Sequence, residues 1–187
     1  FYCSFTANPI GANKKVVTPY LEALSHEIEE IAKYVDERDL NIESVYFGGG
    51  TPSLLKLEHL VQVFDCIHKL YTVNPNAEIT LEANPDDIDE IHVQQWIQVG
   101  INRLSIGIQS FDEKDLKWMN RAHSSQQATN CLSIAQQAGI TNISLDLMYG
   151  LPMMDNDRWL EQIQKALALQ PTHISAYCLT VEENTVL

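Results

Sequence analysis

A run of three glycines, Gly48–Gly50, follows a short apolar segment and is continued by the polar turn Thr51–Ser53. The apolar segment, Val45–Phe47, is β-branched and aromatic, which predicts a buried strand ending in a tight loop. Glycine opens backbone conformations that other residues avoid and lets a ligand rest directly against the main chain. The loop is therefore either a flexible connection or a binding surface made of backbone groups.

Polar residues recur where the later apolar strands are predicted to end. Because the carboxyl ends of parallel strands meet at one edge of a sheet, we expect these residues to lie together. Taken singly, each has an ordinary explanation, such as a helix cap, a loop hydrogen bond or a surface ion pair. Together they favour a polar small-molecule site. They are Gly48–Thr51, Glu82 with Asn84, Gln109, Asp146, Tyr177–Thr180, and Arg121 just beyond the Gln109 strand.

These residue types suit a zwitterionic nucleoside. Backbone groups of a glycine loop bind an ammonium through C=O and a carboxylate through N–H, and a carboxylate such as Glu82 or Asp146 accepts both hydroxyls of a ribose. Arg121 is able to grip a carboxylate with two parallel hydrogen bonds. No phosphate-loop lysine follows the glycines, so a nucleoside triphosphate fits poorly.

The elements that must position these residues alternate along the chain. Apolar periodicity and turn residues predict helices and strands in turn, which favours right-handed βαβ crossovers and a parallel sheet. A closed eight-stranded barrel needs about 250 residues, so we expect an α/β fold with a partial barrel or an open sheet. The predicted helices are 18–39 (with Thr18 as cap and Pro19 as first residue), 57–70, 88–99, 113–119, 125–138 (closed by Gly139) and 158–169, and the strands are 44–47, 77–83, 102–108, 142–148 and 173–179.

Composition excludes some classes of partner. The 187 residues are 45% hydrophobic and 20% charged, with a net charge of −13. Such a surface repels phosphate backbones and anionic lipid, so no nucleic acid partner is expected. No apolar run is long enough to cross a membrane, so no membrane insertion is expected either. The chain begins with Phe1 and ends without a closing element, which suggests a fragment of a longer protein.

The four cysteines show no paired spacing. Cys66 and Cys131 fall on apolar helix faces and Cys178 in a strand, where a cysteine usually serves as a small buried hydrophobe. This usage favours a reducing cytoplasm. Cys3 differs, because it stands between Tyr2 and Phe5 at the start of the chain.

Several motifs resemble those of the radical S-adenosylmethionine (SAM) superfamily. The run GGGTPS resembles the glycine motif that holds the methionyl ammonium in that superfamily. The runs LEANP, RLSIGIQSF, NRAHS and LDLMYGLP are similar, in order and spacing, to the oxygen-independent coproporphyrinogen III oxidase-like family. The resemblance spans essentially the whole chain and implies a partial, three-quarter-type β/α barrel of parallel strands.

Two details resemble the heme chaperones of the HemW type within that family. The family's cluster loop reads C-x-x-x-C-x-Y-C, followed by x-C in the dehydrogenases and x-F in the chaperones, and Tyr2–Phe5 matches the end of the chaperone form. The His-Ser pair in Arg121–Ser124 is also chaperone-like. The resemblance therefore implies a heme chaperone first and a coproporphyrinogen III oxidase, which decarboxylates propionates oxidatively, as the alternative.

The resemblance also implies cofactors and site residues. Cys3 would be the third thiolate on a [4Fe–4S] cluster whose open iron is filled by SAM, and electron transfer to SAM would give a 5′-deoxyadenosyl radical. No catalytic side chain is assigned. The positions that match SAM-contacting residues are Tyr2, Gly49, Gly50, Thr51, Glu82, Gln109, Arg121 and Asp146.

In this interpretation residues 1–187 are a radical SAM core domain that lacks the first strand, two further cluster cysteines and a C-terminal domain. With Cys3 as the single cluster cysteine, this stretch by itself is not expected to hold a cluster. Heme or a porphyrinogen, a heme-acceptor protein, an electron-donor protein and a second copy of the chain are the partners that the resemblance allows. A third hypothesis, from another class, is a cluster-free β/α-barrel enzyme whose glycine loop binds a phosphorylated ligand.

His123 stands apart among the histidines because heme is one of the expected ligands. An exposed histidine at this position would be able to ligate iron, whereas one that neighbours a helix N-cap usually bonds backbone. The other five histidines show no metal-ligand spacing and are assigned no site.

Overall fold

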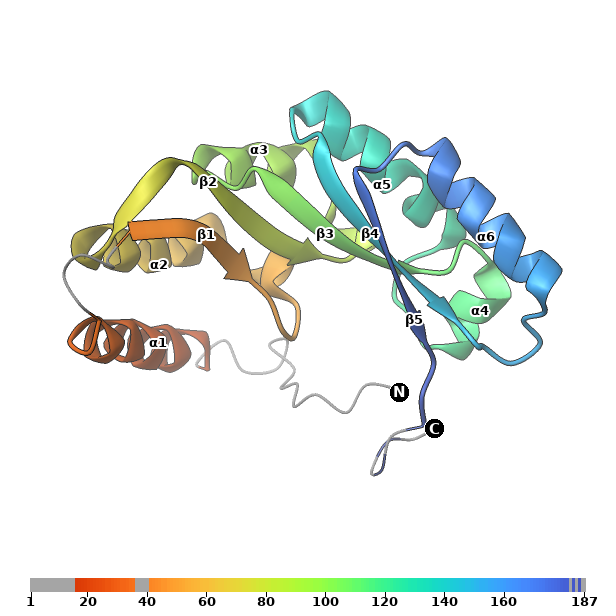
Figure 1. Ribbon diagram of the computed structural model, residues 1–187, viewed down its shortest axis with the longest axis horizontal. Coiled ribbons are helices and arrows are strands. Elements are labelled where there is room, and N and C mark those ends of the chain that lie inside the picture. Colours follow the sequence, from red (N-terminus) through yellow and green to blue (C-terminus); the bar gives the residue numbers. More distant parts are fainter. Residues whose placement is uncertain (1–15, 36–40, 182, 184, 186–187) are drawn as a thin grey trace.

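The computed structural model describes residues 16–35, 41–181, 183 and 185. Strands and helices alternate as the sequence predicts (Figure 1). The elements are α1 (Val17–Ala32), β1 (Asn41–Phe47), η3 (Pro52–Leu54), α2 (Leu57–Leu70), β2 (Thr72–Ala83), η4 (Pro85–Asp87), α3 (Glu90–Gln98), β3 (Arg103–Gln109), α4 (Glu113–Trp118), α5 (Ser125–Ala138), β4 (Asn142–Tyr149), α6 (Asn156–Ala168) and β5 (His173–Cys178).

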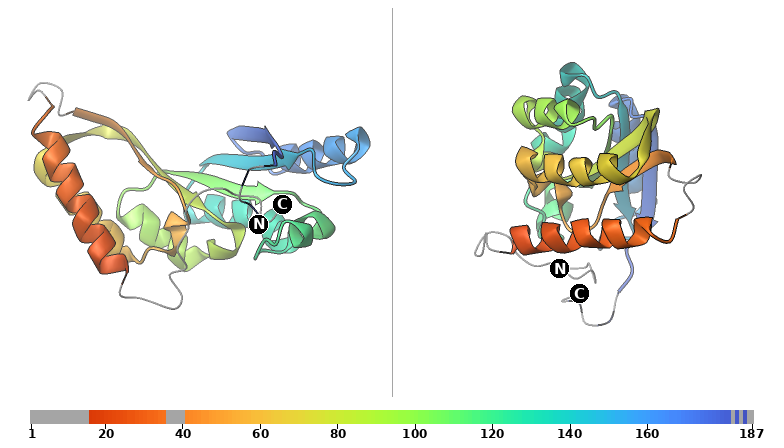
Figure 2. Two further views of the ribbon diagram at one scale, coloured as in Figure 1. Left: turned by 90° about the horizontal axis from the view of Figure 1, so that it is seen from below. Right: turned by 90° about the vertical axis from the view of Figure 1, so that its left-hand side faces the viewer.

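The five described strands form one parallel sheet in the order β1-β2-β3-β4-β5. A doubly wound sheet reverses its strand order at a switch point, and no such reversal occurs among these strands. Each right-handed crossover therefore advances in the same direction and leaves its helix on the same side of the sheet. Figures 1 and 2 show the result, a curled half-barrel with helices on its outer face. The partial barrel, and not an open doubly wound sheet, is confirmed.

The outer face of the sheet carries the main hydrophobic core. Alternate strand residues such as Leu81, Leu104 and Leu145 point to this face and are fully buried. They pack against apolar residues of α2, α3, α5 and α6, among them Trp96 on α3. Because strand side chains alternate between the two faces, every residue between these core positions must lie on the inner face.

The inner face is polar. The strand register aligns Glu82 with Ser105 and Gly107 with Asp146, and Asp146 in turn with Ser175. These residues are two positions apart or directly opposite one another, so they share the concave surface of the half-barrel. The strands thus have an apolar outer face and a polar inner face. The register brings the polar side chains at the strand ends next to each other on the inner face.

Side-chain caps and a glycine explain several of the helix ends. Ser124 and Gln127 form a reciprocal capping box at the start of α5, and Gly139 ends this helix with a left-handed φ of 117°, as predicted. Asp89 caps α3 by accepting from the backbone N–H of His92. Asp155 caps α6 in the same way, so α6 begins at Asn156, two residues before the predicted start.

The predicted boundaries differ most from the structure at α1 and β2. Helix α1 begins at Val17, so Thr18 is not its cap, and it ends at Ala32, seven residues before the predicted end. Strand β2 begins at Thr72, five residues before the predicted start at Ala77. The strand pairs with β1 on both sides of an irregularity that contains Pro75, a residue tolerated where the ladder is interrupted.

The cysteine prediction holds in part. Cys131 is buried, Cys66 is half-buried, and both lie on helices. Cys178 is exposed, which contradicts its predicted burial. Strand β5 has a partner strand on only one side among the described elements, and none of its residues is buried. No helix of the described residues is long and apolar enough to cross a membrane.

Truncating the centre of the core tests this architecture. Leu104 is 0% exposed on β3, and its replacement by alanine is expected to lower the free energy of unfolding by about 2–5 kcal/mol through the cavity it leaves. Leu167 on α6 is 59% exposed, so Leu167→Ala is expected to change it by no more than about 0.5 kcal/mol. Urea unfolding measures both. Equal losses from the two variants would contradict the assignment of the outer sheet face as the core.

Candidate functional site

A pocket of about 220 Å³ opens at the carboxyl ends of the strands. Its lining comes from β2, β3, β4, the glycine loop and the segment before α5. Asn84, predicted at this edge, lines the pocket. So do all the described residues that the resemblance matches to SAM contacts, which are the seven residues Gly49, Gly50, Thr51, Glu82, Gln109, Arg121 and Asp146. Tyr2 and Cys3 lie outside the described residues. That the seven residues bind a cofactor stays a prediction, whereas their gathering at one edge is a feature of the fold.

The glycine loop needs its glycines for backbone conformation. Gly49 and Gly50 have φ values of 79° and 59°, in the left-handed region that favours glycine, and a Cβ at either position would meet nothing within 4 Å. At Gly48 a Cβ would approach Cε1 of Tyr46 to 2.7 Å, so a side chain there would force Tyr46 to move. The backbone N–H of Gly49 donates to Oε2 of Glu82 at 2.9 Å, which folds the loop back over the end of β2.

Glu82 is the hub of this side of the pocket. Its other oxygen, Oε1, accepts from the hydroxyl of Tyr46 at 2.9 Å. Burial and this hydrogen bond raise the pKa of Tyr46, so the phenol remains a donor at neutral pH. A carboxylate offers about four acceptor positions, and these two bonds leave room for a ligand hydroxyl on Glu82.

Asp146 on β4 faces the same space. Burial raises its pKa, and the charge of Glu82 adds to this rise, while hydrogen bonds from Tyr177 and Ser175 act in the opposite direction. Burial, together with the neighbouring carboxylate of Asp146, also raises the pKa of Tyr177. Two carboxylates in one partly dry pocket repel each other, and a cationic ligand would relieve that repulsion.

Gln109 occupies a strained turn at the end of β3. Its φ is 65°, and the backbone N–H of Ser110 donates to the carbonyl of Ile108 at 2.8 Å, which closes a three-residue turn around Gln109. A non-glycine residue in this conformation costs about 1–3 kcal/mol and persists only where its surroundings hold it. The buried Oε1 of Gln109 has no hydrogen-bond partner within the described chain, so the pocket contains an acceptor that suits a ligand donor.

Arg121 reaches the pocket from the segment between α4 and α5. Its Nη2 donates to Oδ1 of Asn84 at 2.7 Å and to the carbonyl of Gly107 at 2.8 Å. A Cβ at Gly107 would lie 3.4 Å from that Nη2 and 3.1 Å from Nε2 of Gln109. The absence of a side chain at Gly107 therefore lets the guanidinium and the Gln109 carboxamide lie side by side over β3.

His123 does not have the exposed position that iron ligation would need. Its side chain is 0% exposed and its Nε2 lies 3.1 Å from the carbonyl of Ile108. Burial lowers its pKa, and the nearby charge of Arg121 lowers it further, so the imidazole is neutral and Nε2–H donates to Ile108. Of the two alternatives left open by the sequence, the structure supports the second, in which this histidine bonds backbone. His123 thus anchors the end of β3.

Sequence reasoning missed one long-range hydrogen bond and four lining residues, which are Pro52, Ala83, Ser105 and Gly107. Ser105 and Gly107 alternate with Leu104, Ile106 and Ile108 along β3, and this period of two would have placed them on the polar face beside Gln109. The hydrogen bond is 2.6 Å long and runs from Oγ of Ser53 to Oδ2 of Asp87. It ties η3, which directly follows the glycine loop, to η4. No local pattern in the sequence announces that long-range pair.

Comparison with known families agrees with this geometry. The model of the radical SAM superfamily matches residues 1–166. The chain belongs to the radical SAM superfamily. Membership implies SAM and a [4Fe–4S] cluster as cofactors. Among the described residues no group of three or more His, Cys, Asp or Glu side chains is arranged to hold a metal ion, and Cys3 lies outside that part.

Within this superfamily, the chain is similar to heme chaperones and to an oxidase of coproporphyrinogen III. The chain is 37% identical over 187 residues to the heme chaperone HemW of Buchnera aphidicola and 33% identical over 185 residues to that of Escherichia coli, each alignment covering 99% of this chain. Each covers 48% of the relative, so the chain spans about half the length of these proteins. The structure of coproporphyrinogen III oxidase (HemN) from Escherichia coli, a radical SAM enzyme, is also similar, with a TM-score of 0.81 and 26% identity over 90% of this chain and 38% of that one.

The raised pKa of Asp146 makes a prediction about stability. A carboxyl whose folded pKa lies above its unfolded value takes up protons on folding, so its ionised form destabilises the fold above that pKa and the effect fades as pH falls. Asp146→Asn is therefore expected to raise the thermal unfolding midpoint of the ligand-free protein by a few degrees at pH 8. The gain should shrink on acidification. A lower midpoint at pH 8 would show that the bond with Tyr177 outweighs burial.

Proposed function

We propose that residues 1–187 are the radical SAM core domain of a HemW-type heme chaperone that binds SAM in the strand-end pocket. The observation that carries the proposal is the gathering of seven motif residues in one pocket, in a chain 33–37% identical to heme chaperones over 99% of its length. The proposal concerns the whole protein, of which this chain is the part that would bind SAM.

The charges and donors of the pocket fit SAM. The ligand carries a sulfonium, an ammonium and a carboxylate, and is a net cation. The charged residues that line the pocket are Glu82, Asp146 and Arg121, which sum to one negative charge when ionised. Such a site attracts a cation and is a poor site for phosphate, which counts against the hypothesis of a cluster-free, phosphate-binding enzyme.

Each group has a role in this assignment. Carbonyls of the Gly49–Gly50 loop would hold the ammonium, and Arg121 would face the methionyl carboxylate. Glu82 and Asp146 would accept the ribose hydroxyls, and the unpaired Oε1 of Gln109 would accept a further ligand donor. Tyr2 and the cluster thiolate of Cys3 belong to the same proposal through the sequence motif alone.

When bound, SAM and a reduced cluster supply reductive cleavage of the sulfonium C–S bond. The residues of this chain would orient the nucleoside and keep water from the reacting bond. The bonds of Glu82 with Gly49 and Tyr46 prepare that orientation before any ligand arrives, because they fix the loop and the carboxylate together.

Coproporphyrinogen III oxidation is the second candidate. The similarity to HemN in both fold and sequence favours it. Against it stands Phe5, which occupies the position of the additional cysteine in the family's dehydrogenases. Heme or a porphyrinogen, a heme-acceptor protein, an electron donor, a second copy of the chain and a cytoplasmic location stay predictions.

Two assays on the full-length protein separate chaperone from oxidase. The protein is reconstituted anaerobically with iron and sulfide, titrated with heme, and incubated in parallel with coproporphyrinogen III, SAM and a reductant. We expect stoichiometric heme binding without formation of protoporphyrinogen IX. Efficient conversion would instead establish the oxidase and show that Phe5 does not prevent that chemistry.

A matched pair of glutamates tests the binding pocket. Glu82→Gln is expected to weaken SAM binding about 10–100-fold, because bonds to a charged acceptor contribute about 1.5–3 kcal/mol each. Glu78 lies on the same face of β2 but outside the pocket, so Glu78→Gln should leave the dissociation constant within about twofold. Equilibrium dialysis with labelled SAM measures both. Equal losses would indicate a general effect of negative charge on this face.

A further inference from the structure

The turn at Gln109 is held from both sides by buried side chains. Before the turn, the carbonyl of Ile108 accepts from His123 as well as from the backbone N–H of Ser110. After the turn, the chain passes through Ser110 and Phe111, which are 0% and 5% exposed. A strained residue between two buried segments keeps its conformation only while both segments are fixed.

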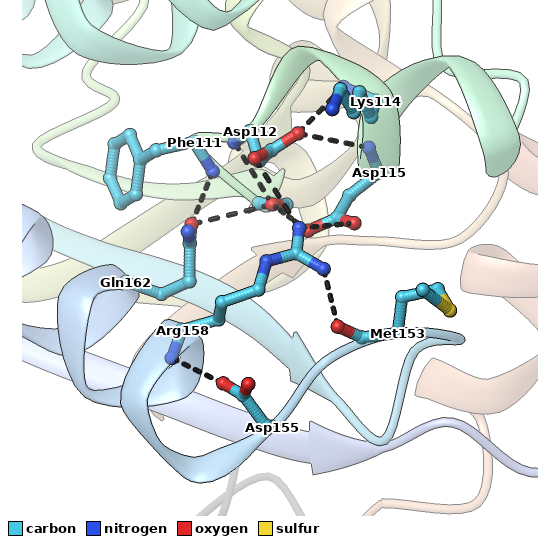
Figure 3. Close-up of polar contacts among 9 residues, drawn as sticks. Phe111, Asp112, Lys114, Asp115, Met153, Asp155, Arg158 and Gln162 are labelled. Carbon is cyan, nitrogen blue, oxygen red and sulfur yellow. Dashed lines mark hydrogen bonds and ion pairs between the residues drawn. The ribbon is translucent and has the colours of Figure 1, made fainter.

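The segment after the turn is fixed by Gln162 of α6. The Oε1 of Gln162 accepts from the backbone N–H of Phe111 at 2.7 Å and lies 3.3 Å from Oγ of Ser110 (Figure 3). Gln162 is 2% exposed, so this carboxamide lies on the buried side of the amphipathic helix α6. Without this carboxamide the N–H of Phe111 would be a buried donor with no acceptor, which a protein avoids by moving the backbone.

Asp115 and Arg158 complete the arrangement. The hydroxyl of Ser110 has one proton, which we assign to Oδ2 of Asp115 at 2.9 Å because that bond is shorter and its acceptor is charged. Arg158 on α6 donates to Oδ1 of Asp115 at 3.1 Å and to the carbonyl of Met153 at 2.6 Å (Figure 3). The firm contact of Gln162 is therefore its bond with Phe111, and the ion pair holds α6 in register with α4.

We propose that Gln162 is a positioning residue for the SAM site, acting through the backbone of Phe111 on the side chain of Gln109. The inference rests on the proposed function, in which Gln109 contacts SAM. Gln109 is the central residue of the strained turn, and Phe111 follows it after Ser110. Gln162 is not among the residues that line the pocket. Loss of the bond allows the turn to relax toward a negative φ and turns the Gln109 carboxamide away from the ligand.

The test is a double-mutant cycle on the full-length, anaerobically reconstituted protein, with the dissociation constant of SAM as readout. Gln162→Leu is expected to weaken SAM binding about tenfold. Gln164→Leu, an exposed change on the same helix, is expected to alter binding less than twofold. Gln162→Glu keeps an acceptor oxygen for Phe111 in either protonation state, so its dissociation constant for SAM is expected to stay within threefold of that of the natural protein. This variant keeps the test valid if the leucine variant fails to fold.

The cycle is closed on a Gln109→Ala background. Because Gln162 is proposed to act through Gln109, adding Gln162→Leu there is expected to cost less than a further twofold in affinity. A full additional tenfold loss would show general loosening and overturn the inference, as would a loss for Gln162→Glu equal to that for Gln162→Leu. If Gln162→Leu bound SAM as tightly as the natural protein, the inference would be overturned and the proposed function would stand. If the natural protein did not bind SAM, the proposed function itself would be overturned.

Discussion

The structure depends on one geometrical constraint, the alternation of side chains along parallel strands that all follow one another in sequence. Helices on a single side demand apolar residues at every second strand position, as at Leu104, Ile106 and Ile108. The positions between them are then free to be polar, and the register gathers them on the concave face. The core and the pocket are thus formed by alternate residues of the same strands. A shift of one residue in register would exchange the residues of the core face with those of the pocket face.

Sequence alone predicted the order of elements and most of the pocket, because both depend on local signals. Turn residues mark the strand ends, and a polar side chain there must lie at the shared edge, as Glu82 and Asp146 do. Boundaries failed where tertiary pairing overrode a local signal, as at Pro75 within β2. The role of Gln162 could not be predicted from the sequence, because a glutamine on an amphipathic helix resembles a surface residue and its partner Phe111 is distant in the chain.

The pocket collects features that work against stability. A left-handed φ at Gln109, a buried acceptor without a partner, and a carboxyl at Asp146 with a raised pKa all cost free energy in the ligand-free fold. A cationic nucleoside with hydroxyl and amine donors would satisfy these groups together. The unfavourable terms are concentrated at one strand edge, which is the pattern expected where binding, and not folding, determines the residues.

Figure 3 shows why α6 matters to a pocket that it does not line. The contacts of Gln162 with the chain after β3 are buried and the contact of Arg158 with Asp115 is partly buried, and such hydrogen bonds and ion pairs have narrow geometric tolerance. The Gln109 turn therefore follows the position of α6 through Gln162 and Asp115. A partner or a further domain that displaced α6 would change the ligand site without touching it, since the strained turn has a relaxed alternative to adopt.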